Sequence, residues 1–255
     1  SQHLTILKTV FERLRKAKLK INRAKCSWLA KKIKLLGHII EKGVIKMDTE
    51  KIKAIINRKA PLNVKDVQVW LGSINFYRKF VSNLALHVRP LTDLINKKNK
   101  WKWEKEEQKA FDDVKRFLTS YPILRIPDFN RMFILDCDAS EKAIGAILGQ
   151  NDDNNDRYAC EYESRVLRGA ELNYTVTEKE LLAVILGLTK FRVYLLGRKF
   201  KIYTDHVALQ WIINLKDPIG RLYRWAVLIQ QFDFEIVYKK GSSHANADSL
   251  SRPVF

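Results

Sequence analysis

The stretch Arg131–Gln150, RMFILDCDASEKAIGAILGQ, decides how the second half of the chain folds. The strand formers Phe133–Leu135 begin a β-strand that ends in Asp136-Cys137-Asp138, and Ala143–Leu148 begins a second apolar run after a short polar turn. A carboxylate at the end of a buried strand costs free energy unless a cation or hydrogen bonds compensate for it. A site at Asp138 therefore requires other acidic side chains to reach the same end of the strand.

The rest of the second half predicts an α+β fold. We expect a third strand, then a helix, a strand, two helices, a strand and a short helix. Their ranges are Tyr158–Ser164, Thr177–Phe191, Phe200–Thr204, Val207–Asn214, Arg221–Phe232, Phe234–Tyr238 and Ala245–Ser251. This order fits a mixed five-stranded sheet with flanking helices.

The first half predicts mainly helices. Leu4–Lys18 has apolar residues at helical spacing, and Lys32–Lys46 predicts a hairpin that turns at Glu41-Lys42-Gly43. Further helices are expected to begin near Asp48, Asn63, Leu84 and Glu104. Tyr121–Asp128 contains two prolines and is interpreted as a linker between the halves.

The excess positive charge is confined to the first half. The net charge is +19; residues 1–125 contain 30 Lys and Arg against 11 Asp and Glu, whereas residues 126–255 contain 17 of each. This asymmetry favours a polyanionic partner, most simply nucleic acid. The alternative is a basic surface that only keeps the protein in solution.

Composition also argues against several classes of protein. No apolar run approaches the ~20 residues that a membrane helix needs, so no membrane partner is expected. The basic, amphipathic start at Ser1–Lys20 does not read as a signal peptide. Cys26, Cys137 and Cys160 form no CxxC pair and are interpreted as reduced core thiols of an intracellular protein.

Four acidic residues lie at the ends of predicted elements in the second half. Asp138 ends the first strand and Asp205 ends the fourth, while Glu180 and Asp248 lie in the first turns of helices. If the first and fourth strands are neighbours, their acids lie side by side and the helix starts can add the others. Such a cluster needs counter-charge, and Mg²⁺ or Mn²⁺ prefers oxygen ligands. Two such ions about 3.5–4 Å apart catalyse phosphodiester hydrolysis.

Each acid also has a structural explanation of its own. Thr177-x-x-Glu180 fits a capping box, Asp248 could cap the last helix, and Asp205 could be a turn residue. One shared site explains all four acids more economically than four separate coincidences. Asp136 lies on the same strand face as Asp138, but no other feature of the sequence assigns it to the site, so it is left out.

Long stretches of the second half are family motifs. They are DASEKAIGAILGQ, ELNYTVTEKELLAVILGLTKFRVYLLGRKFKIYTDHVALQWI and GRLYRWAVLIQQFDFEIVYKKGSSHANADSLSR. These stretches resemble the RNase H domain of Pol polyproteins from gypsy-type LTR retrotransposons. Upstream, LKINRAKCSWL, LLGHII, LGSINFYRKFV, PLTDLI and PDF resemble the end of that family's reverse transcriptase palm and its thumb.

The resemblance implies an RNase H-like fold and two-metal cleavage of the RNA strand of RNA–DNA hybrids. It implies two Mg²⁺ ions, or Mn²⁺, held by Asp138, Glu180, Asp205 and Asp248 as the catalytic residues. It divides the chain into a palm remnant (1–46), a helical thumb or connection (47–125) and an RNase H domain (126–255). The partners would be a hybrid and the palm and fingers of the same polyprotein, in the cytoplasm, the nucleus or a virus-like particle.

The chain also departs from the family pattern. The family's polymerase needs a YxDD hairpin, and Phe111-Asp112-Asp113 does not supply one because it falls in the middle of a predicted helix. We therefore expect no polymerase activity from this chain. Glu163 stands where the family has an apolar and aromatic strand, which puts the stability of the third strand in doubt. The alternative function is a non-catalytic, nucleic-acid-binding or domesticated remnant, against which the four intact acids argue.

Two glycines and two basic residues are candidates for nucleic-acid contacts in the first half. Gly37 and His38 resemble the family's primer grip, although an ordinary hairpin with a closely packed glycine is the alternative. Gly72, inside a predicted helix, would let a backbone approach closely, and Lys65 would meet a phosphate.

Four arginine and lysine residues complete the candidate set. Arg78 and Lys79 follow the same helix as Gly72 and would also contact phosphates. Arg221 and Arg224 lie on a later helix and would touch the hybrid. A solvated helix face is the alternative for this second pair.

Overall fold

The computed structural model describes the whole chain except residues 1, 97–98, 121–122, 205–211, 213–219 and 239–255. The chain divides into two compact units, Ser1–Ile33 and Lys34–Phe255. The first unit contains α1 (Gln2–Lys16) and the 3₁₀ turn η1 (Arg23–Lys25). In the described part of the chain, no helix has the length and apolarity needed to cross a bilayer. The predicted division at residues 46 and 125 stays a prediction.

A small antiparallel sheet contains the predicted hairpin. Its strands are β1 (Lys32–Leu35), β2 (His38–Glu41), β3 (Val44–Met47) and β4 (Leu124–Arg125), in that order across the sheet. Two tight turns with positive φ, at Leu36-Gly37 and Lys42-Gly43, produce three strands where one hairpin was predicted. The interpretation of 121–128 as a linker is wrong at β4, which pairs with β3.

The helices between β3 and β4 form what we call the helical layer (residues 49–119). They are α2 (Thr49–Ile56), α3 (Val64–Asn75), η2 (Arg78–Phe80), α4 (Leu84–His87), α5 (Arg89–Asp93) and α6 (Lys105–Thr119). The predicted caps are confirmed, since Asp48 and Asn63 accept backbone N–H bonds of 3.1 and 3.0 Å. The helix predicted from Leu84 is two short helices, because Pro90 has no N–H to continue the first one.

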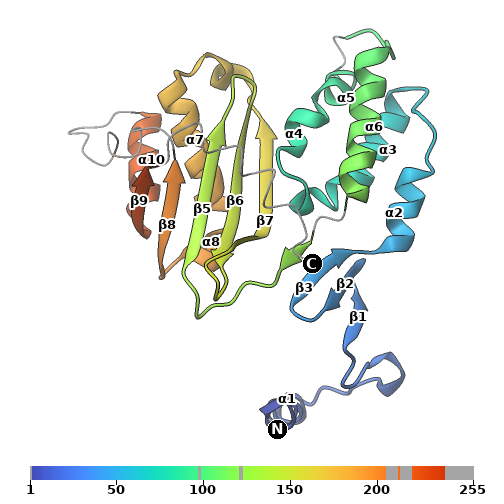
Figure 1. The fold of residues 1–255 in the computed structure, drawn as a ribbon, viewed down its shortest axis with the longest axis vertical. Coiled ribbons are helices and arrows are strands. Elements are labelled where there is room, and N and C mark those ends of the chain that lie inside the picture. The colour runs from blue at the N-terminus through green and yellow to red at the C-terminus, as the bar shows by residue number, and fades with distance from the viewer. Residues whose placement is uncertain (1, 97–98, 121–122, 205–211, 213–219, 239–255) are drawn as a thin grey trace. The chain divides into compact units, whose positions relative to one another are not determined.

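The second half forms the mixed five-stranded sheet that the sequence predicted, which confirms the α+β class (Figure 1). Its strands are β5 (Phe133–Ala139), β6 (Ala143–Asn151), β7 (Arg157–Val166), β8 (Lys199–Thr204) and β9 (Asp233–Tyr238). The order is β7-β6-β5-β8-β9; β5, β6 and β7 are antiparallel neighbours, and β8 and β9 run parallel to β5.

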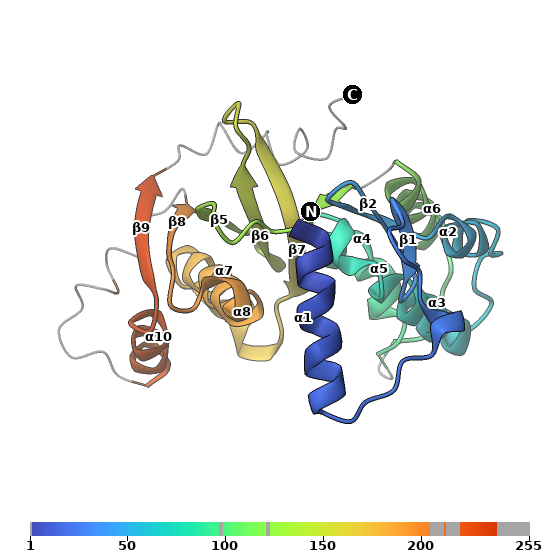
Figure 2. The same cartoon turned by 90° about the horizontal axis from the view of Figure 1, so that it is seen from below.

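Helices α7 (Val176–Lys190) and α8 (Arg192–Leu195) cover one face of this sheet, as Figure 2 shows. The turn η3 (Gly169–Asn173) leads into α7, and α10 (Arg221–Ile229) packs against it. The predicted helices at 207–214 and 245–251 lie outside the described residues, apart from Ile212.

Two hydrophobic cores meet at the edge strand β7. One core lies between the five-stranded sheet and α7, and the other fills the helical layer. Ala159 and Tyr162 of β7 belong to the core of the helical layer, whereas Cys160 belongs to the core under α7. An irregularity in the pairing of β6 and β7 at Leu148/Gly149 puts Ala159 and Tyr162 on the same face, so β7 is buried on both faces. The helical layer therefore packs directly on the sheet.

The three cysteines are free thiols. Cys137 and Cys160 are buried, as predicted, but Cys26 is partly exposed, so the prediction of a core position is wrong for Cys26. Cys26 lies just after η1, in a unit too small to enclose it.

Candidate functional site

The two strands that carry Asp138 and precede Asp205 are neighbours. β5 pairs in parallel with β8, from Phe133 with Phe200 to Asp136 with Tyr203. A shared site requires these two strands to be neighbours. They are, and their carboxyl ends lie at one edge of the sheet. Asp205 follows the last residue of β8, and both Asp205 and Asp248 lie outside the described residues.

Helix α7 lies close against β5 and β6 at Gly187. A Cβ on Gly187 would lie 2.8 Å from Leu135 Cδ1 and 3.1 Å from Ala146 Cβ, so the missing side chain permits the close approach. Because α7 leads through α8 into β8, it runs opposite to β8 and β5. Glu180 lies two turns before Gly187, or about 10 Å along the axis. Asp138 lies about 10 Å beyond Leu135 along the strand, so both acids are at the same end.

The thiol of Cys137 gives a second sign that these acids share a neighbourhood. Burial raises the pKa of the Cys137 thiol well above its ordinary value. Nearby negative charges raise it further, and they belong to Asp136, Glu180 and Asp138. The thiol therefore stays protonated, and acidic side chains from β5 and α7 act on one buried atom.

Glu180 is not the capping residue of α7. The N-cap is Thr175, whose side chain accepts the Glu178 N–H at 3.2 Å, while the Glu178 carboxylate accepts the Thr175 N–H at 3.0 Å. This reciprocal pair is a capping box two residues before the one considered from sequence, so that explanation of Glu180 is wrong. Glu180 is only 5% exposed, which makes it a buried carboxylate that capping does not explain.

Helix α10 contacts the first turn of α7 through Arg221. Arg221 forms an ion pair with Glu178, and its guanidinium lies 4.2 Å from the centre of the Tyr174 ring. Although burial opposes the change, the Arg221 contact helps lower the pKa of Glu178. Arg224, on the same helix, is exposed. The predicted hybrid contacts of both arginines stay predictions, and Arg221 has a structural partner in addition.

Asp136 has an arginine partner of its own. Arg157 Nη2 lies 2.6 Å from Asp136 Oδ2, and the guanidinium lies 4.6 Å from the centre of the Tyr203 ring. The Arg157 side chain passes over β6 at Gly149. A Cβ on Gly149 would lie 3.8 Å from Arg157 Nε. This pair accounts for an acid that sequence reasoning left out of the site. Its arginine comes from a distant strand, and periodicity does not reveal such a partner.

Gly37 and His38 face the helical layer. Tyr77 Oη donates to the Gly37 carbonyl at 3.1 Å, and a Cβ on Gly37 would lie 2.7 Å from Lys51 Nζ. The His38 ring stacks on Phe80 with centroids 5.6 Å apart. Burial, reinforced by nearby lysine charges, lowers the pKa of His38. Close packing thus accounts for this turn, and its contact with a primer stays a prediction.

Of the remaining candidates, Lys65 and Gly72 are open to solvent and Arg78 is not free. Lys65 is exposed, and a Cβ on Gly72 would meet nothing within 4 Å, so α3 offers an accessible face. Arg78 forms an ion pair with Glu163. Lys79 is partly buried, with its ammonium 5.5 Å from the centre of the Phe80 ring. Phosphate contacts by these residues stay predictions.

The ion pair with Arg78 explains the unusual Glu163. This side chain is only 8% exposed. A buried carboxylate is tolerated when a cation compensates for its lost hydration. Glu163 therefore links the sheet to the helical layer, and sequence reasoning missed this because the partner lies 85 positions away.

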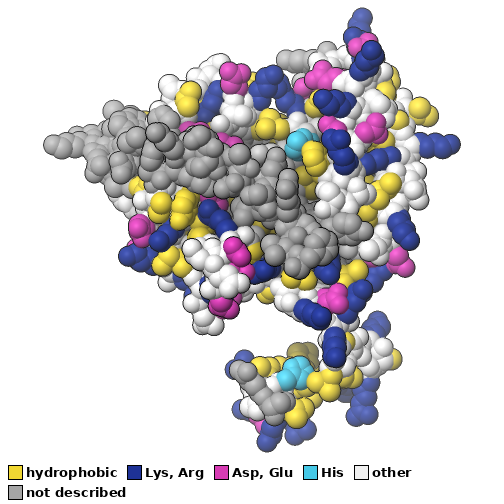
Figure 3. Space-filling model, in the orientation of Figure 1, with side chains coloured by type: hydrophobic (Ala, Val, Ile, Leu, Met, Phe, Trp, Pro, Cys, Tyr) yellow, Lys and Arg dark blue, Asp and Glu magenta, His cyan; other side chains and the backbone are white. Residues whose placement is uncertain are grey.

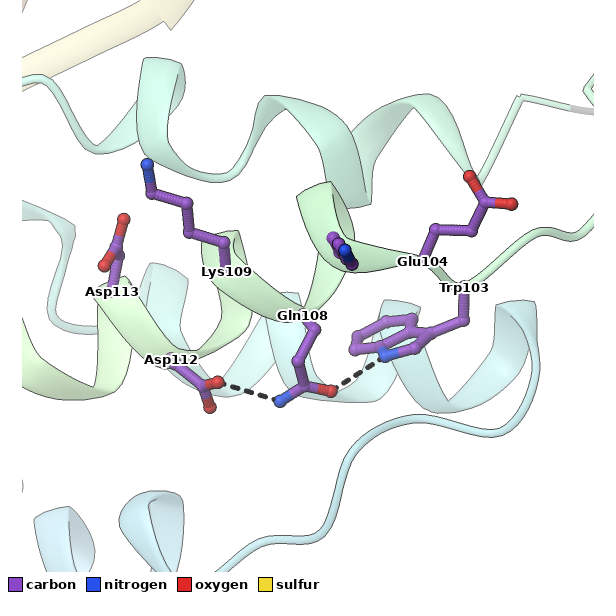
Figure 4. Close-up of a pocket in the computed structure, with 7 residues that line it drawn as sticks. Trp103, Glu104, Gln108, Lys109, Asp112 and Asp113 are labelled. Atoms are coloured by element: carbon purple, nitrogen blue, oxygen red, sulfur yellow. Dashed lines mark hydrogen bonds between the residues drawn. The ribbon is translucent and has the colours of Figure 1, made fainter.

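Basic side chains are spread over the helical layer, interspersed with acidic ones, on the face that Figure 3 shows. A surface pocket of about 590 Å³ lies along α6 (Figure 4). There, Trp103 Nε1 donates to Gln108 Oε1 and Gln108 Nε2 donates to Asp112 Oδ2, both at 2.9 Å. These groups bind one another rather than converge on a ligand. Phe111-Asp112-Asp113 lies within α6, as predicted, so it is no polymerase hairpin.

The two placed acids have the ligand chemistry of a divalent-cation site, and they do not make such a site by themselves. Among the described residues, no three His, Cys, Asp or Glu side chains form a group that could hold a metal ion. Two of the four predicted ligands, Asp205 and Asp248, lie outside that part of the chain. Asp138 and Glu180 supply carboxylate oxygens, the ligand type that Mg²⁺ and Mn²⁺ prefer.

Comparisons with known proteins confirm the resemblance. Residues 128–232 match the RNase H-like domain found in reverse transcriptase. The chain is 40% identical over 253 residues to the retrovirus-related Pol polyprotein from transposon 297 of Drosophila melanogaster. It is also 40% identical over 259 residues to the transposon Tf2-3 polyprotein of Schizosaccharomyces pombe. The chain spans 23% and 19% of the length of these two relatives, respectively.

Solved structures share the fold. The foamy viral protease-reverse transcriptase in complex with an RNA/DNA hybrid superposes with a TM-score of 0.76 at 24% identity, over 94% of this chain and 33% of that one. The same viral protein in complex with dsDNA gives a TM-score of 0.75 at 24% identity, over 94% of this chain and 52% of that one. At this identity the likeness shows the fold alone.

Proposed function

Starting from the RNase H-like domain found in reverse transcriptase, which residues 128–232 match, we propose that this chain cleaves the RNA strand of RNA–DNA hybrids. The observation that carries the proposal is the convergence of Asp138 and Glu180 at one end of the sheet. Both carboxylates act on the Cys137 thiol, and capping does not account for Glu180. A buried acid is costly for folding and is useful where a divalent cation binds.

The proposed ligand set adds the two acids outside the described residues. Asp205 would be the third ligand, because it follows β8 in the sequence and β8 is the parallel neighbour of β5. Asp248 would be the fourth ligand. Two bound Mg²⁺ ions would supply an activated water and neutralise the leaving 3′ oxygen. In this proposal, Arg157 holds Asp136 outside the ligand set, and the Thr175–Glu178 box holds the turn of α7 that presents Glu180.

We further propose that the hybrid is held mainly by the basic first half. Support comes from the excess positive charge there and from the accessible face of α3 at Lys65 and Gly72. The solved foamy viral relative binds an RNA/DNA hybrid. Binding should weaken steeply with salt, because phosphate contacts release counterions. The palm and fingers of the same polyprotein are the proposed protein partners, and the cellular location stays a prediction.

The test is hybrid cleavage in Mg²⁺ by the full chain, compared with Asp138→Asn and Asp205→Asn. Each substitution removes one ligand charge with little change of volume and is expected to reduce cleavage to background. Asp153→Asn is the matched control, because Asp153 is an exposed turn residue whose side chain is 88% accessible. Hybrid binding without cleavage by the unmodified chain would instead support the non-catalytic remnant.

A further inference from the structure

A short segment of the helical layer lies over a row of three residues that pair across neighbouring strands, and one of the three is Asp138. In this row, Asp138 of β5 pairs with Gly145 of β6, and Gly145 pairs with Ser164 of β7. Residues directly opposite each other on antiparallel strands have side chains on the same face. Whatever lies over Gly145 is therefore next to the Asp138 side chain.

Two separate contacts place Asn83–Ala85 over this row. A Cβ built on Gly145 would lie 2.6 Å from Asn83 Oδ1, so the Asn83 amide occupies the space where a side chain would be. The Ala85 N–H donates to Ser164 Oγ at 3.1 Å. The segment is thus fixed on two of the three residues of the row, and the third residue is Asp138.

The conformation of Asn83 shows that its side chain is held for this position rather than for a helix cap. Its backbone is left-handed, with φ 50° and ψ 29°, and its side chain makes no capping bond to α4. Left-handed backbone is uncommon for residues other than glycine, and asparagine is among those that tolerate it best. This conformation directs the amide onto the sheet.

We propose that Asn83 is a positioning residue of the hybrid-cleaving site, an inference that rests on the proposed function. The Cβ atoms of a cross-strand pair lie about 4.5–5.5 Å apart, which puts the Asn83 amide within about 8 Å of Asp138 Cβ. From there one water can donate to both Asn83 Oδ1 and the Asp138 carboxylate. A water held in this way keeps the carboxylate in one orientation towards a divalent cation. The helical layer thereby contributes a residue to a site built on the sheet.

The first test is Asn83→Gly, measured by Mn²⁺ titration calorimetry and by hybrid cleavage. Glycine adopts the left-handed conformation without strain, so the variant removes the amide and keeps the backbone. We expect Mn²⁺ affinity and kcat to fall about tenfold, the lower end of the cost of removing groups that orient metal ligands. KM for the hybrid and the Tm should stay unchanged, which a merely structural role would not produce.

The matched control is Asn155→Gly. Asn155 is also left-handed, with φ 65°, and lies in the exposed turn between β6 and β7, where it accepts a 2.8 Å bond from Asn151. The same chemical change there should alter neither Mn²⁺ affinity nor kcat. An equal loss in both variants would contradict a role specific to Asn83.

The second test is a double-mutant cycle with Gly145→Ala. The added methyl group would displace the Asn83 amide, while its other neighbours are 3.8 Å away. Gly145→Ala alone should therefore lower Mn²⁺ affinity, and it should cost nothing more in the Asn83→Gly background. Additive losses would show that Gly145 acts independently and would overturn the proposal.

The outcomes separate this inference from the proposed function. If the unmodified chain neither binds Mn²⁺ nor cleaves the hybrid, the proposed function fails and this inference fails with it. If the unmodified chain does both and Asn83→Gly matches it, only the role of Asn83 is wrong.

Discussion

Helices α6 and α7 both begin with a capping box, yet they use their acidic residues differently. In α6, Glu104 is the N-cap and Glu107 returns the bond to its N–H at 2.9 Å, on the surface of the helical layer. In α7, Glu178 plays the returning role, and Glu180 is additionally buried. Glu180 takes no part in this capping box. The comparison therefore separates acids that hold structure from acids available for chemistry.

The largest effect should come from the buried acid. Glu180→Gln keeps the shape of the side chain and removes its charge, so hybrid cleavage should fall by more than about 100-fold, because even groups that only orient ligands cost 10–100-fold. Stability should stay the same or rise, since the charge is costly to bury. Cleavage assays and thermal melts measure the two quantities. A marked loss of stability with cleavage retained would show that Glu180 has a structural role, like the capping acids of α6 and α7.

The next effect concerns an acid that holds structure. Arg78→Ala leaves Glu163 buried without its arginine, and losing one member of a buried pair costs about 3 kcal/mol or more. Arg224→Ala, at an exposed position, should cost less than about 0.5 kcal/mol. Urea unfolding of both variants measures the difference. Equal midpoints would mean that the Arg78–Glu163 link contributes nothing to the packing of the layer on the sheet.

Removing a cap should have a smaller effect. Glu178→Gln weakens the capping box and the ion pair with Arg221, and we expect a loss of about 1 kcal/mol in the free energy of unfolding. Glu107→Gln changes the equivalent residue of α6 and should cost a similar amount or less. Cleavage should survive in both variants. Loss of cleavage with Glu107→Gln would contradict the separation of roles.

The smallest effect is a pH dependence that also originates at Glu178. Its folded-state pKa is lowered, so it contributes stability above the unfolded pKa, and this is lost as pH falls through the folded pKa. The unmodified chain should lose stability below about pH 4.5, and Glu178→Gln should lose less. Chemical unfolding between pH 3 and 6 compares the slopes. Parallel curves would show that the Arg221 contact does not act in the folded state.

Much of the fold follows from local patterns, and the site follows in part. Alternation predicted the five-stranded sheet, and Asp48 and Asn63 marked helix starts correctly, because strands and caps depend on neighbouring residues. The capping box of α7 was misplaced by two residues, since Thr175-x-x-Glu178 and Thr177-x-x-Glu180 fit the same pattern. Only the fold shows which glutamate caps the helix.

Contacts between distant segments could not be predicted from the sequence. The partners of Asp136 and Glu163 come from other strands or from the helical layer, so no spacing in the sequence identifies them. The turn at Leu36-Gly37 was missed because leucine is an unusual residue for positive φ. The sequence predicted only that a helix begins near Leu84, and the position of Asn83 over Gly145 depends on how the layer packs on the sheet.

The central claim is that Asp138 and Glu180 belong to one divalent-ion site. A crystal structure of the chain soaked in Mn²⁺ tests it most directly, because anomalous scattering locates the ion without reference to the protein. We predict an anomalous peak with carboxylate oxygens of both Asp138 and Glu180 in its coordination shell. A peak bound to only one of these residues, or no peak at this end of the sheet, would contradict the account.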